Sequence, residues 1–326
     1  MMEFRAFDDF IPIAKENRGK ASLQYGIEYL DRATGGIRSS DLVVIGGRTG
    51  AGKTELSSII AQNNALLMKK VYVFSLESER GEFVNRILFR RFSKHYYAAG
   101  HKKPVYYRSF IEEEYDSKYG QLIKEAESDA EFRYPSLNIL ERDDYFGILE
   151  FKMCVQMIKD DADLIIVDHL HHFDSDTDNE IREIKETVKA IRDMCLLHNK
   201  PIILIAHFRK GDRKSKELVP DLEEFHGSSE ISKVATQVIT LARYEEEQVE
   251  PCLYPTLFKV CKFRKDGSVA RYVGKQYYST IHNNYEKRYT LHTLEKSGTE
   301  LADVPECNYP HWARTEVINK IGDVRL

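Results

Sequence analysis

The chain has 326 residues, of which 42% are hydrophobic and 31% are charged, a balance typical of a folded protein with ample material for a core. This length fits one large domain or two small ones. The net charge of −4 excludes binding to nucleic acid through overall basicity, so any such surface has to be local. The scattered cysteines indicate a reduced, cytoplasmic protein, and no run approaches the roughly 18 apolar residues of a membrane span, so no membrane partner is expected.

Residues 1–25 are expected to form a leader that is too short to fold alone. Its hydrophobic side chains cluster at Phe4, Phe7, Phe10, Ile11 and Ile13. Two interpretations stay open: an arm that docks on a neighbouring subunit, or a helix that packs on its own domain. One large domain is expected over residues 26–298, followed by an irregular tail over residues 299–326.

A phosphate-binding loop follows the leader. Residues 47–54 read GRTGAGKT, which is a complete G-x-x-x-x-G-K-[ST] motif. The apolar run over residues 41–45 predicts a buried strand before the loop, and residues 55–68 predict a helix after it. This context makes a chance glycine-rich turn the weaker interpretation, and the helix would direct the positive end of its dipole at the phosphates.

The chemistry of the loop predicts bound ATP with Mg²⁺. Backbone N–H groups would surround the β-phosphate, Lys53 would reach the β- and γ-phosphates, and the hydroxyl of Thr54 would ligate Mg²⁺. The residues expected to hold the nucleotide are Gly47, Thr49, Gly50, Ala51, Gly52, Lys53, Thr54 and Glu55.

The remaining pattern predicts an α/β fold. Strands are expected over residues 70–75, 137–140, 163–168, 201–206, 237–242 and 256–262, and helices from about residue 79, over 147–159 and over 181–195. Apolar, β-branched runs that alternate with helices are typical of a mostly parallel sheet with helices on both faces. The stretch over residues 94–135 has helical pieces and no chemistry that the sequence identifies.

Two acidic residues extend the candidate site. Asp168 closes the apolar strand DLIIVD and is a candidate second anchor for Mg²⁺. Glu77 follows the strand VYVFSL and would orient the attacking water if its strand lies beside the first one. The alternative for Glu77 is a residue that complements a helix dipole.

The order of segments resembles the ATPase domain of replicative helicases of the DnaB, Twinkle and phage primase-helicase type, which have a RecA-like P-loop NTPase fold and work as hexameric rings. The resemblance covers roughly residues 20–285. It is carried by GIEYLDRATGGIRSSDLVVIGGRTGAGKT, VFSLESE, DLIIVDHLHHF, PIILIAHFRK and KVCKFRKDG. It implies catalytic roles for Lys53 and Glu77 and a Mg²⁺-binding role for Asp168.

The resemblance also implies roles for three basic residues. His207 would be the γ-phosphate sensor, as in the phage and Twinkle branches, and Arg264 would be an arginine finger that acts on a neighbouring subunit. Arg243 would contact one face of the nucleotide base, and Tyr277 or Tyr278 would stack on the other face of that base. The alternatives are a structural histidine and a solvated turn arginine.

The segment after His207 is strongly basic. It lies where the DNA-binding loop of this family projects into the ring channel, and its positive residues are Arg209, Lys210, Arg213, Lys214 and Lys216. Such a loop would bind the phosphates of single-stranded DNA in a salt-sensitive way. The alternative is a solvated surface, and the loop after Asp168 is more acidic than a strong DNA binder would need.

The resemblance therefore implies an ATP-hydrolysing, ring-type 5′–3′ DNA helicase or translocase, although the residues themselves do not give the polarity. Such a protein would act near the nucleoid or in an infected cell. The chain lacks the primase half and the helical N-terminal domain, so a loader, a primase or another partner is expected to supply those tasks. A regulatory ATPase of the RecA, RadA or KaiC type, from a mobile element, phage or defence system, is the main alternative. A non-enzymatic nucleotide-binding module is disfavoured by the apparently intact set of Lys53, Thr54, Glu77 and Asp168.

Overall fold

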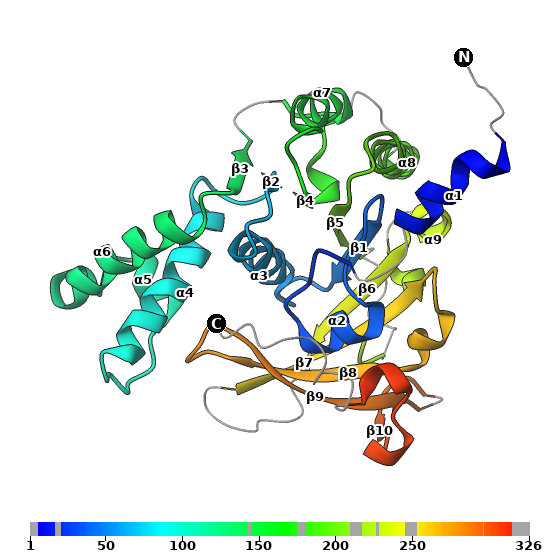
Figure 1. Ribbon diagram of the computed structural model, residues 1–326. Helices are drawn as coiled ribbons and strands as arrows, with labels where there is room; N and C mark the ends of the chain where they lie inside the picture. The colour runs from blue at the N-terminus through cyan, green and yellow to red at the C-terminus, as the bar shows by residue number, and fades with distance from the viewer. Residues whose placement is uncertain are drawn as a thin grey trace.

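The computed structural model describes residues 6–16, 21–142, 145–174, 180–208, 217–225, 228–244, 253–295 and 297–314. Its centre is a ten-stranded sheet in the order β10-β9-β8-β7-β6-β1-β5-β4-β2-β3 (Figure 1). The strands are β1 (Leu42–Gly47), β2 (Val71–Ser75), β3 (Leu137–Glu141), β4 (Leu164–Asp168), β5 (Ile202–His207), β6 (Gln237–Arg243), β7 (Leu253–Phe263), β8 (Val273–Ser279), β9 (Asn284–Leu294) and β10 (Leu301–Asp303). The helices are α1 (Phe7–Glu16), α2 (Glu28–Thr34), α3 (Lys53–Leu66), α4 (Glu82–Ala98), α5 (Tyr107–Ile111), α6 (Asp116–Arg133), α7 (Ile148–Ile158), α8 (Glu180–His198) and α9 (Ser228–Val234).

The strands from β6 to β3 are parallel and form the predicted core of the sheet. They are apolar along their whole length because helices cover both faces. Alternate residues of β1 serve opposite faces: Val43 and Ile45 pack with α3, whereas Leu42 and Val44 pack with α7 and α8. Figure 1 shows α7 and α8 on one side of these strands and α3 on the other. The predicted α/β class is confirmed.

The second half of the sheet, from β7 to β10, is antiparallel, which the sequence pattern did not predict. Residues 256–262 were expected to add a strand to the parallel, helix-alternating pattern. The segment over residues 244–252 is shorter than the dozen or so residues that a parallel crossover needs. β7 therefore runs back along β6 as a hairpin partner, and the following strands continue the meander.

The stretch over residues 94–135, which had no assignment, belongs to a helical projection. α4 packs against α6, with α5 between them in the chain, and an aromatic cluster that includes Phe89, Phe92 and Tyr96 fills the space. In Figure 1 these helices extend from the sheet on the side of β3. Arg90 ties α4 to α3 through Gln62 and the Ser58 hydroxyl, so the projection is fixed to the helix that follows the phosphate-binding loop.

The two ends of the described chain differ in how they pack. Near the C-terminal end, Trp312 makes an edge-on contact with Tyr29 of α2, and the Arg314 carbonyl accepts a hydrogen bond from Arg32. At the other end, α1 lies at the periphery of the molecule (Figure 1), with the side chain of Phe7 81% exposed. None of the helices in the described ranges is long and apolar enough to cross a bilayer.

Candidate functional site

The phosphate-binding loop connects the end of β1 to the start of α3, as the motif requires. Gly50 and Gly52 have φ angles of +79° and +92°, in the left-handed region that residues with a Cβ rarely adopt. The loop curls around the ammonium of Lys53, which donates hydrogen bonds to the carbonyls of Gly47 at 3.1 Å and Arg48 at 3.2 Å. Burial lowers the pKa of Lys53, and the carboxylates of Glu77 and Asp168 counteract that shift.

Asp168 ends β4 and is buried beside α3. Its Oδ2 accepts a hydrogen bond from the Ser57 hydroxyl at 2.8 Å, whereas its Oδ1 is buried and has no hydrogen-bond partner among the described residues. Burial raises the pKa of this carboxyl to about 6, and the nearby charge of Glu77 adds to the shift. A buried carboxylate oxygen without a partner, close to the first turn of α3 with Thr54, fits a hard cation such as Mg²⁺.

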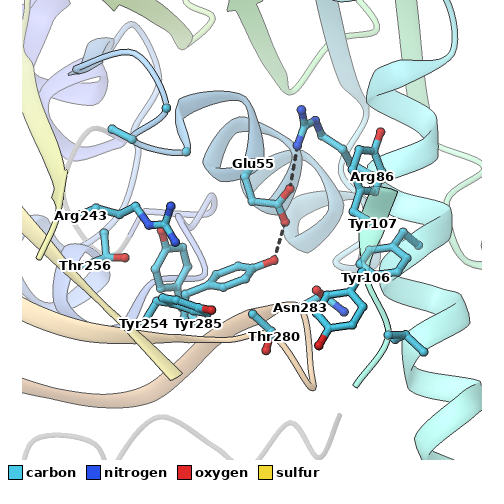
Figure 2. Close-up of a pocket in the computed structure, with 16 residues that line it drawn as sticks. Glu55, Arg86, Tyr106, Tyr107, Arg243, Tyr254, Thr256, Thr280, Asn283 and Tyr285 are labelled. Carbon is cyan, nitrogen blue, oxygen red and sulfur yellow. Dashed lines mark hydrogen bonds and ion pairs between the residues drawn. The ribbon is translucent and has the colours of Figure 1, made fainter. Parts of the chain in front are cut away.

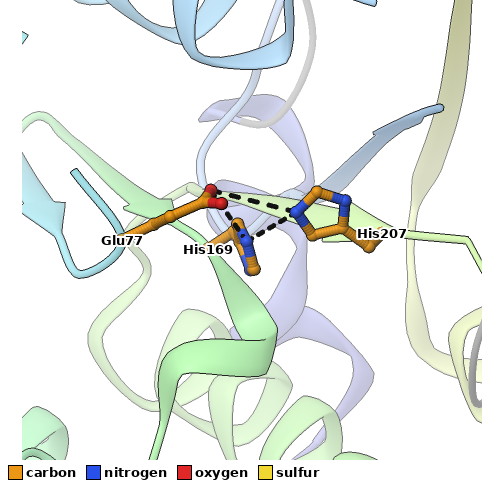
Figure 3. A group of neighbouring side chains, drawn as sticks. All are labelled: Glu77, His169 and His207. Carbon is orange, nitrogen blue, oxygen red and sulfur yellow. Dashed lines mark hydrogen bonds and ion pairs between the residues drawn. The ribbon is translucent and has the colours of Figure 1, made fainter. Parts of the chain in front are cut away.

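Three further side chains meet at the ends of neighbouring strands. Glu77 follows β2, His169 follows β4, and His207 ends β5. The Leu76 N–H donates to the Asp168 carbonyl at 2.7 Å, which continues the pairing of β2 with β4 beyond the strands and sets the position of Glu77. The Nε2 of His169 lies 2.8 Å from the Glu77 Oε2 and 2.6 Å from the Nε2 of His207 (Figure 3).

The hydrogen bonds of His169 decide which ring nitrogen carries the proton. Its Nδ1 accepts a hydrogen bond from the His171 backbone N–H at 3.2 Å, so the proton of the neutral ring lies on Nε2, which faces Glu77. Burial, followed by the nearby imidazole of His207, lowers the pKa of His169 to about 2. Burial, followed by the charge of Lys53, lowers the pKa of His207 to about 4. Both imidazoles are therefore neutral at pH 7.

His169 was absent from the sequence prediction. The run HLHHF after Asp168 indicates a loop, and a strand pattern does not tell which of several adjacent histidines turns toward the neighbouring strand. His169 is 2% exposed, and its partners come from segments 92 and 38 positions away in the chain, so only the sheet order brings them together.

A cavity of about 460 Å³ opens beside the phosphate-binding loop, between α3, the α4–α5 segment and the antiparallel strands (Figure 2). Glu55 projects into it and accepts a hydrogen bond from the Tyr278 hydroxyl at 2.9 Å. The guanidinium groups of Arg86 and Arg90 each approach the same carboxylate to 3.5 Å. Glu55 is therefore held by three partners on the wall of the cavity.

Arg243 lines the same cavity at the end of β6. Its guanidinium stacks over the ring of Tyr254 at 5.0 Å from the centroid. Tyr254 and Tyr106, which also line the cavity, were not predicted, because a tyrosine in a strand or a loop carries no signal of the cavity that it faces. Of the two tyrosines considered on β8, Tyr278 lines the cavity.

Arg264 does not join these groups. Its backbone N–H donates to the Thr236 carbonyl at 2.9 Å, next to the start of β6, and its guanidinium reaches the Lys233 carbonyl at 3.3 Å. The other end of β6 is registered with Gly47, where the phosphate-binding loop begins. Arg264 therefore lies at one end of β6, and its own phosphate-binding loop lies at the opposite end of that strand.

The basic segment with Arg209, Lys210, Arg213, Lys214 and Lys216 lies outside the described residues. Phe208, which precedes it, packs edge-on against Phe225 with ring centroids 4.7 Å apart. The described chain before this segment thus ends in an aromatic contact between the partly buried Phe208 and the buried Phe225.

Residues 22–272 match the model of the DnaB-like helicase C terminal domain. The chain belongs to this family. It is 23% identical over 240 residues to the replicative DNA helicase DnaB of Nostoc sp., covering 72% of this chain and 26% of that protein. It is 24% identical over 277 residues to the replicative DNA helicase DnaC of Bacillus subtilis, covering 81% of this chain and 57% of that protein. The chain thus spans between about a quarter and somewhat more than half of these relatives.

Solved structures agree on the fold of this DnaB-like domain. One of them, the structure of an ATPase domain, superposes with a TM-score of 0.66 at 15% identity, covering 93% of this chain and all of that one. A DnaB-like replicative helicase, described together with its interactions with primase, superposes with a TM-score of 0.64 at 15% identity, covering 93% of this chain and 68% of that one. The predicted kinship is confirmed, whereas the role of each site residue stays a prediction.

Proposed function

We propose that this DnaB-like domain is the motor of a ring-shaped helicase, which hydrolyses Mg·ATP between subunits and moves along single-stranded DNA. The observation that carries the proposal is the convergence of Lys53, at the start of α3, with Asp168 and Glu77, which stand at the ends of the neighbouring strands β4 and β2. A P-loop lysine, a carboxylate for water and a buried carboxylate for the metal are the groups that phosphoryl transfer needs.

In this proposal the triphosphate occupies the loop that now folds around Lys53. The ammonium would exchange its two carbonyl partners for phosphate oxygens. Thr54 and Asp168 would hold Mg²⁺, which, when bound, neutralises phosphate charge.

Glu77 would orient the attacking water and accept its proton. The hydrogen bond from His169 fixes the carboxylate at a point beside the phosphate-binding loop. His207, neutral and half-buried, would contact the γ-phosphate by hydrogen bonding rather than as a cation. The roles of both histidines depend on the sheet order, because it aligns the ends of β2, β4 and β5.

The charge on the transferred phosphoryl group would be stabilised by Arg264 of a neighbouring copy. The position of Arg264 supports a role on a neighbouring subunit, because the arginine lies at the opposite end of β6 from its own phosphate-binding loop. An arginine finger supplied by another chain is worth about 10³–10⁵ in rate in other phosphoryl-transfer proteins. Hydrolysis would therefore require assembly.

The cavity beside the loop would take the nucleotide base. Its volume of about 460 Å³ lies within the range of small-molecule sites, and six of its sixteen lining residues are aromatic. Arg243 and Tyr254 present a stacked pair on one side. The α4–α5 segment contributes Tyr106 and Tyr107 on another, so this projection would take part in nucleotide binding.

Two exposed apolar rows in the described part of the chain suggest how copies meet. On α7, Leu149, Met153 and Met157 follow one another at four-residue spacing and are 66%, 66% and 82% exposed. On α1, Phe7 and Ile11 have the same spacing and are also exposed. We propose that α1 of one copy packs on α7 of the next, which is the arm interpretation of the leader.

The basic segment after His207 would bind single-stranded DNA in the ring channel. Its location supports coupling, because a change at His207 on loss of the γ-phosphate would be felt at the next residue, Phe208. Five positive charges and one negative charge over residues 209–216 would give binding that weakens with salt.

Steady-state ATP hydrolysis with and without single-stranded DNA tests this function, with Lys53→Ala as the blank. Several-fold stimulation by DNA is expected, and the triple variant Lys210→Glu, Lys214→Glu and Lys216→Glu should lose the stimulation while it keeps DNA-independent hydrolysis. Hydrolysis that DNA does not change would contradict translocation and favour a regulatory ATPase.

A further inference from the structure

We propose that Glu77, His169 and His207 form a binding site for a divalent transition-metal ion, with Zn²⁺ as the best match, and that the occupied site stops ATP hydrolysis. The inhibitory half of this inference rests on the proposed function. The metal-binding half rests on the geometry of the three side chains alone.

The three ligand atoms are already gathered at the distances that a metal centre needs. The pairs Glu77 Oε2–His169 Nε2, His169 Nε2–His207 Nε2 and His207 Nε2–Glu77 Oε2 are 2.8, 2.6 and 3.8 Å apart. Zinc bonds of about 2.0–2.1 Å in a tetrahedron place neighbouring ligand atoms about 3.4 Å apart. Each pair therefore has to shift by less than about 1 Å, which small side-chain rotations provide.

The set of donor atoms selects the kind of metal. Two imidazole nitrogens and one carboxylate oxygen are the ligands of many zinc sites and suit other late divalent transition metals, whereas Mg²⁺ prefers oxygen ligands alone. The predicted Mg²⁺ anchors, Thr54 and Asp168, supply oxygen atoms only. The two sites would thus differ in the metal they take although Asp168 and His169 are adjacent in the chain.

The position of the cluster at the ends of neighbouring strands also favours a metal. Each ligand stands at the end of a different neighbouring strand, so the sheet fixes their spacing (Figure 3). Coordination through the Nε2 of His169 would place its ring proton on Nδ1. The 3.2 Å hydrogen bond that this nitrogen accepts from the His171 N–H would then be given up. Glu77, with its side chain 43% exposed, leaves an entry path from solvent.

Metal binding would disable the hydrolytic groups directly. A carboxylate of Glu77 that ligates a metal would no longer accept the proton of the attacking water, and His207 would no longer be available to the γ-phosphate. Three protein ligands leave a fourth coordination position that water can fill. The bound ion would therefore act as a reversible inhibitor at the catalytic centre rather than as a second catalytic metal.

Titration of the full chain with Co²⁺ tests binding, because a tetrahedral Co²⁺ site with nitrogen ligands absorbs visible light. A stoichiometry of one ion per chain is expected, with displacement by Zn²⁺. His169→Ala and His207→Ala should each weaken binding by at least about ten-fold. The exposed His282 lies outside the cluster, so His282→Ala is the matched control and should bind as the unchanged protein does. Equal binding by all variants would overturn the site.

His169 is buried, so its variant is checked by thermal unfolding. His207 is more exposed, and its variant keeps the test decisive if His169→Ala does not fold. Micromolar Zn²⁺ in excess Mg²⁺ should inhibit ATP hydrolysis, and a zinc-selective chelator should restore it. Binding without inhibition would overturn the inhibitory half. If the metal-free protein does not hydrolyse ATP, the proposed function fails, and the Co²⁺ titration still decides the metal site.

Discussion

The Nε2 of His169 lies 2.8 Å from the Oε2 of Glu77, although the two residues follow different strands, β4 and β2. The His171 backbone N–H occupies the other ring nitrogen, so the proton of the neutral imidazole faces the carboxylate. A charge-assisted hydrogen bond of this kind holds a carboxylate at one point. His169 is therefore the positioning residue for the group that we propose to activate water.

Replacement of His169 tests that relationship. His169→Ala is expected to lower kcat by about 10- to 100-fold, the equivalent of one hydrogen bond to a charged group, while KM for ATP changes little. His169→Gln keeps an N–H donor and should retain more of the rate. Steady-state kinetics at fixed DNA and Mg²⁺ give both parameters, and His282→Ala serves as the control. Equal losses in the alanine and glutamine variants would contradict a role through the hydrogen bond.

Asp168 should destabilise the metal-free protein at neutral pH. Its pKa is raised to about 6 in the folded protein from about 4 in the unfolded chain, so the folded protein holds this proton more tightly. Unfolding therefore releases the proton between about pH 4 and pH 6, and the contribution of this group to the free energy of unfolding falls as the pH rises through that window. Above pH 6 this group lowers the free energy of unfolding by its full amount, on the order of 3 kcal/mol.

Asp168→Asn removes the charge and should raise the melting temperature of the nucleotide-free protein at pH 7. The gain should shrink toward pH 4, where the native carboxyl is protonated as well. Differential scanning calorimetry at several pH values measures this dependence. The same variant should lose stabilisation by Mg·ATP, because the partner of the metal is gone. A variant less stable than the native protein at pH 7 would contradict the assignment.

Arg243 should contribute to the binding of the nucleotide base and not to the binding of the phosphates. Arg243→Ala is expected to weaken ATP binding by about ten-fold, the value of one stacking or cation–π contact in a desolvated site, with kcat little changed. Inorganic tripolyphosphate is the matched probe, since it lacks the base. Its affinity, measured by competition, should be the same in both proteins. A parallel loss for tripolyphosphate would place Arg243 on the phosphates.

The contact between α1 and α7 should control assembly. Met153→Glu places a charge in the centre of the exposed apolar row on α7 and should shift the protein toward monomers in sedimentation velocity runs with Mg·ATP. Phe132→Glu is the control, because Phe132 is 84% exposed on α6, away from that row. Oligomers that survive Met153→Glu, or that fail equally with Phe132→Glu, would rule out this docking mode.

The sequence predicted the parts of this protein that follow from local pattern. The motif over residues 47–54 needs only a strand before it and a helix after it, and the apolar run ending at Asp168 needs only a buried position. Burial on both faces makes such strands continuous and apolar, so their existence was predictable. Glu77 was placed beside the loop on the condition that its strand neighbours the first one. In the structure β4 and β5 stand between β2 and β1, and Glu77 reaches the site at the ends of the strands.

What the sequence could not give depends on pairing between distant segments. Strands β8 and β9 are more polar than the apolar parallel strands and were not expected, and only the short link before β7 indicated a hairpin. The contact of His169 with Glu77 and the stacking of Tyr254 on Arg243 require the strand order and register. Neither contact produces a periodic pattern in the sequence, because a single side chain that faces a site cannot be told from other residues of its type.

Completion of each site by a neighbouring chain is the central feature of the proposed function. It is tested most directly by mixing two inactive variants, Glu77→Gln and Arg264→Ala, and measuring ATP hydrolysis. An Arg264→Ala chain keeps its own Glu77 and can receive an intact arginine from a Glu77→Gln neighbour. In an equal mixture about a quarter of the interfaces would be complete, so activity well above that of either variant alone is predicted. No recovery, with mixed assemblies demonstrated by native mass spectrometry, would contradict hydrolysis between subunits.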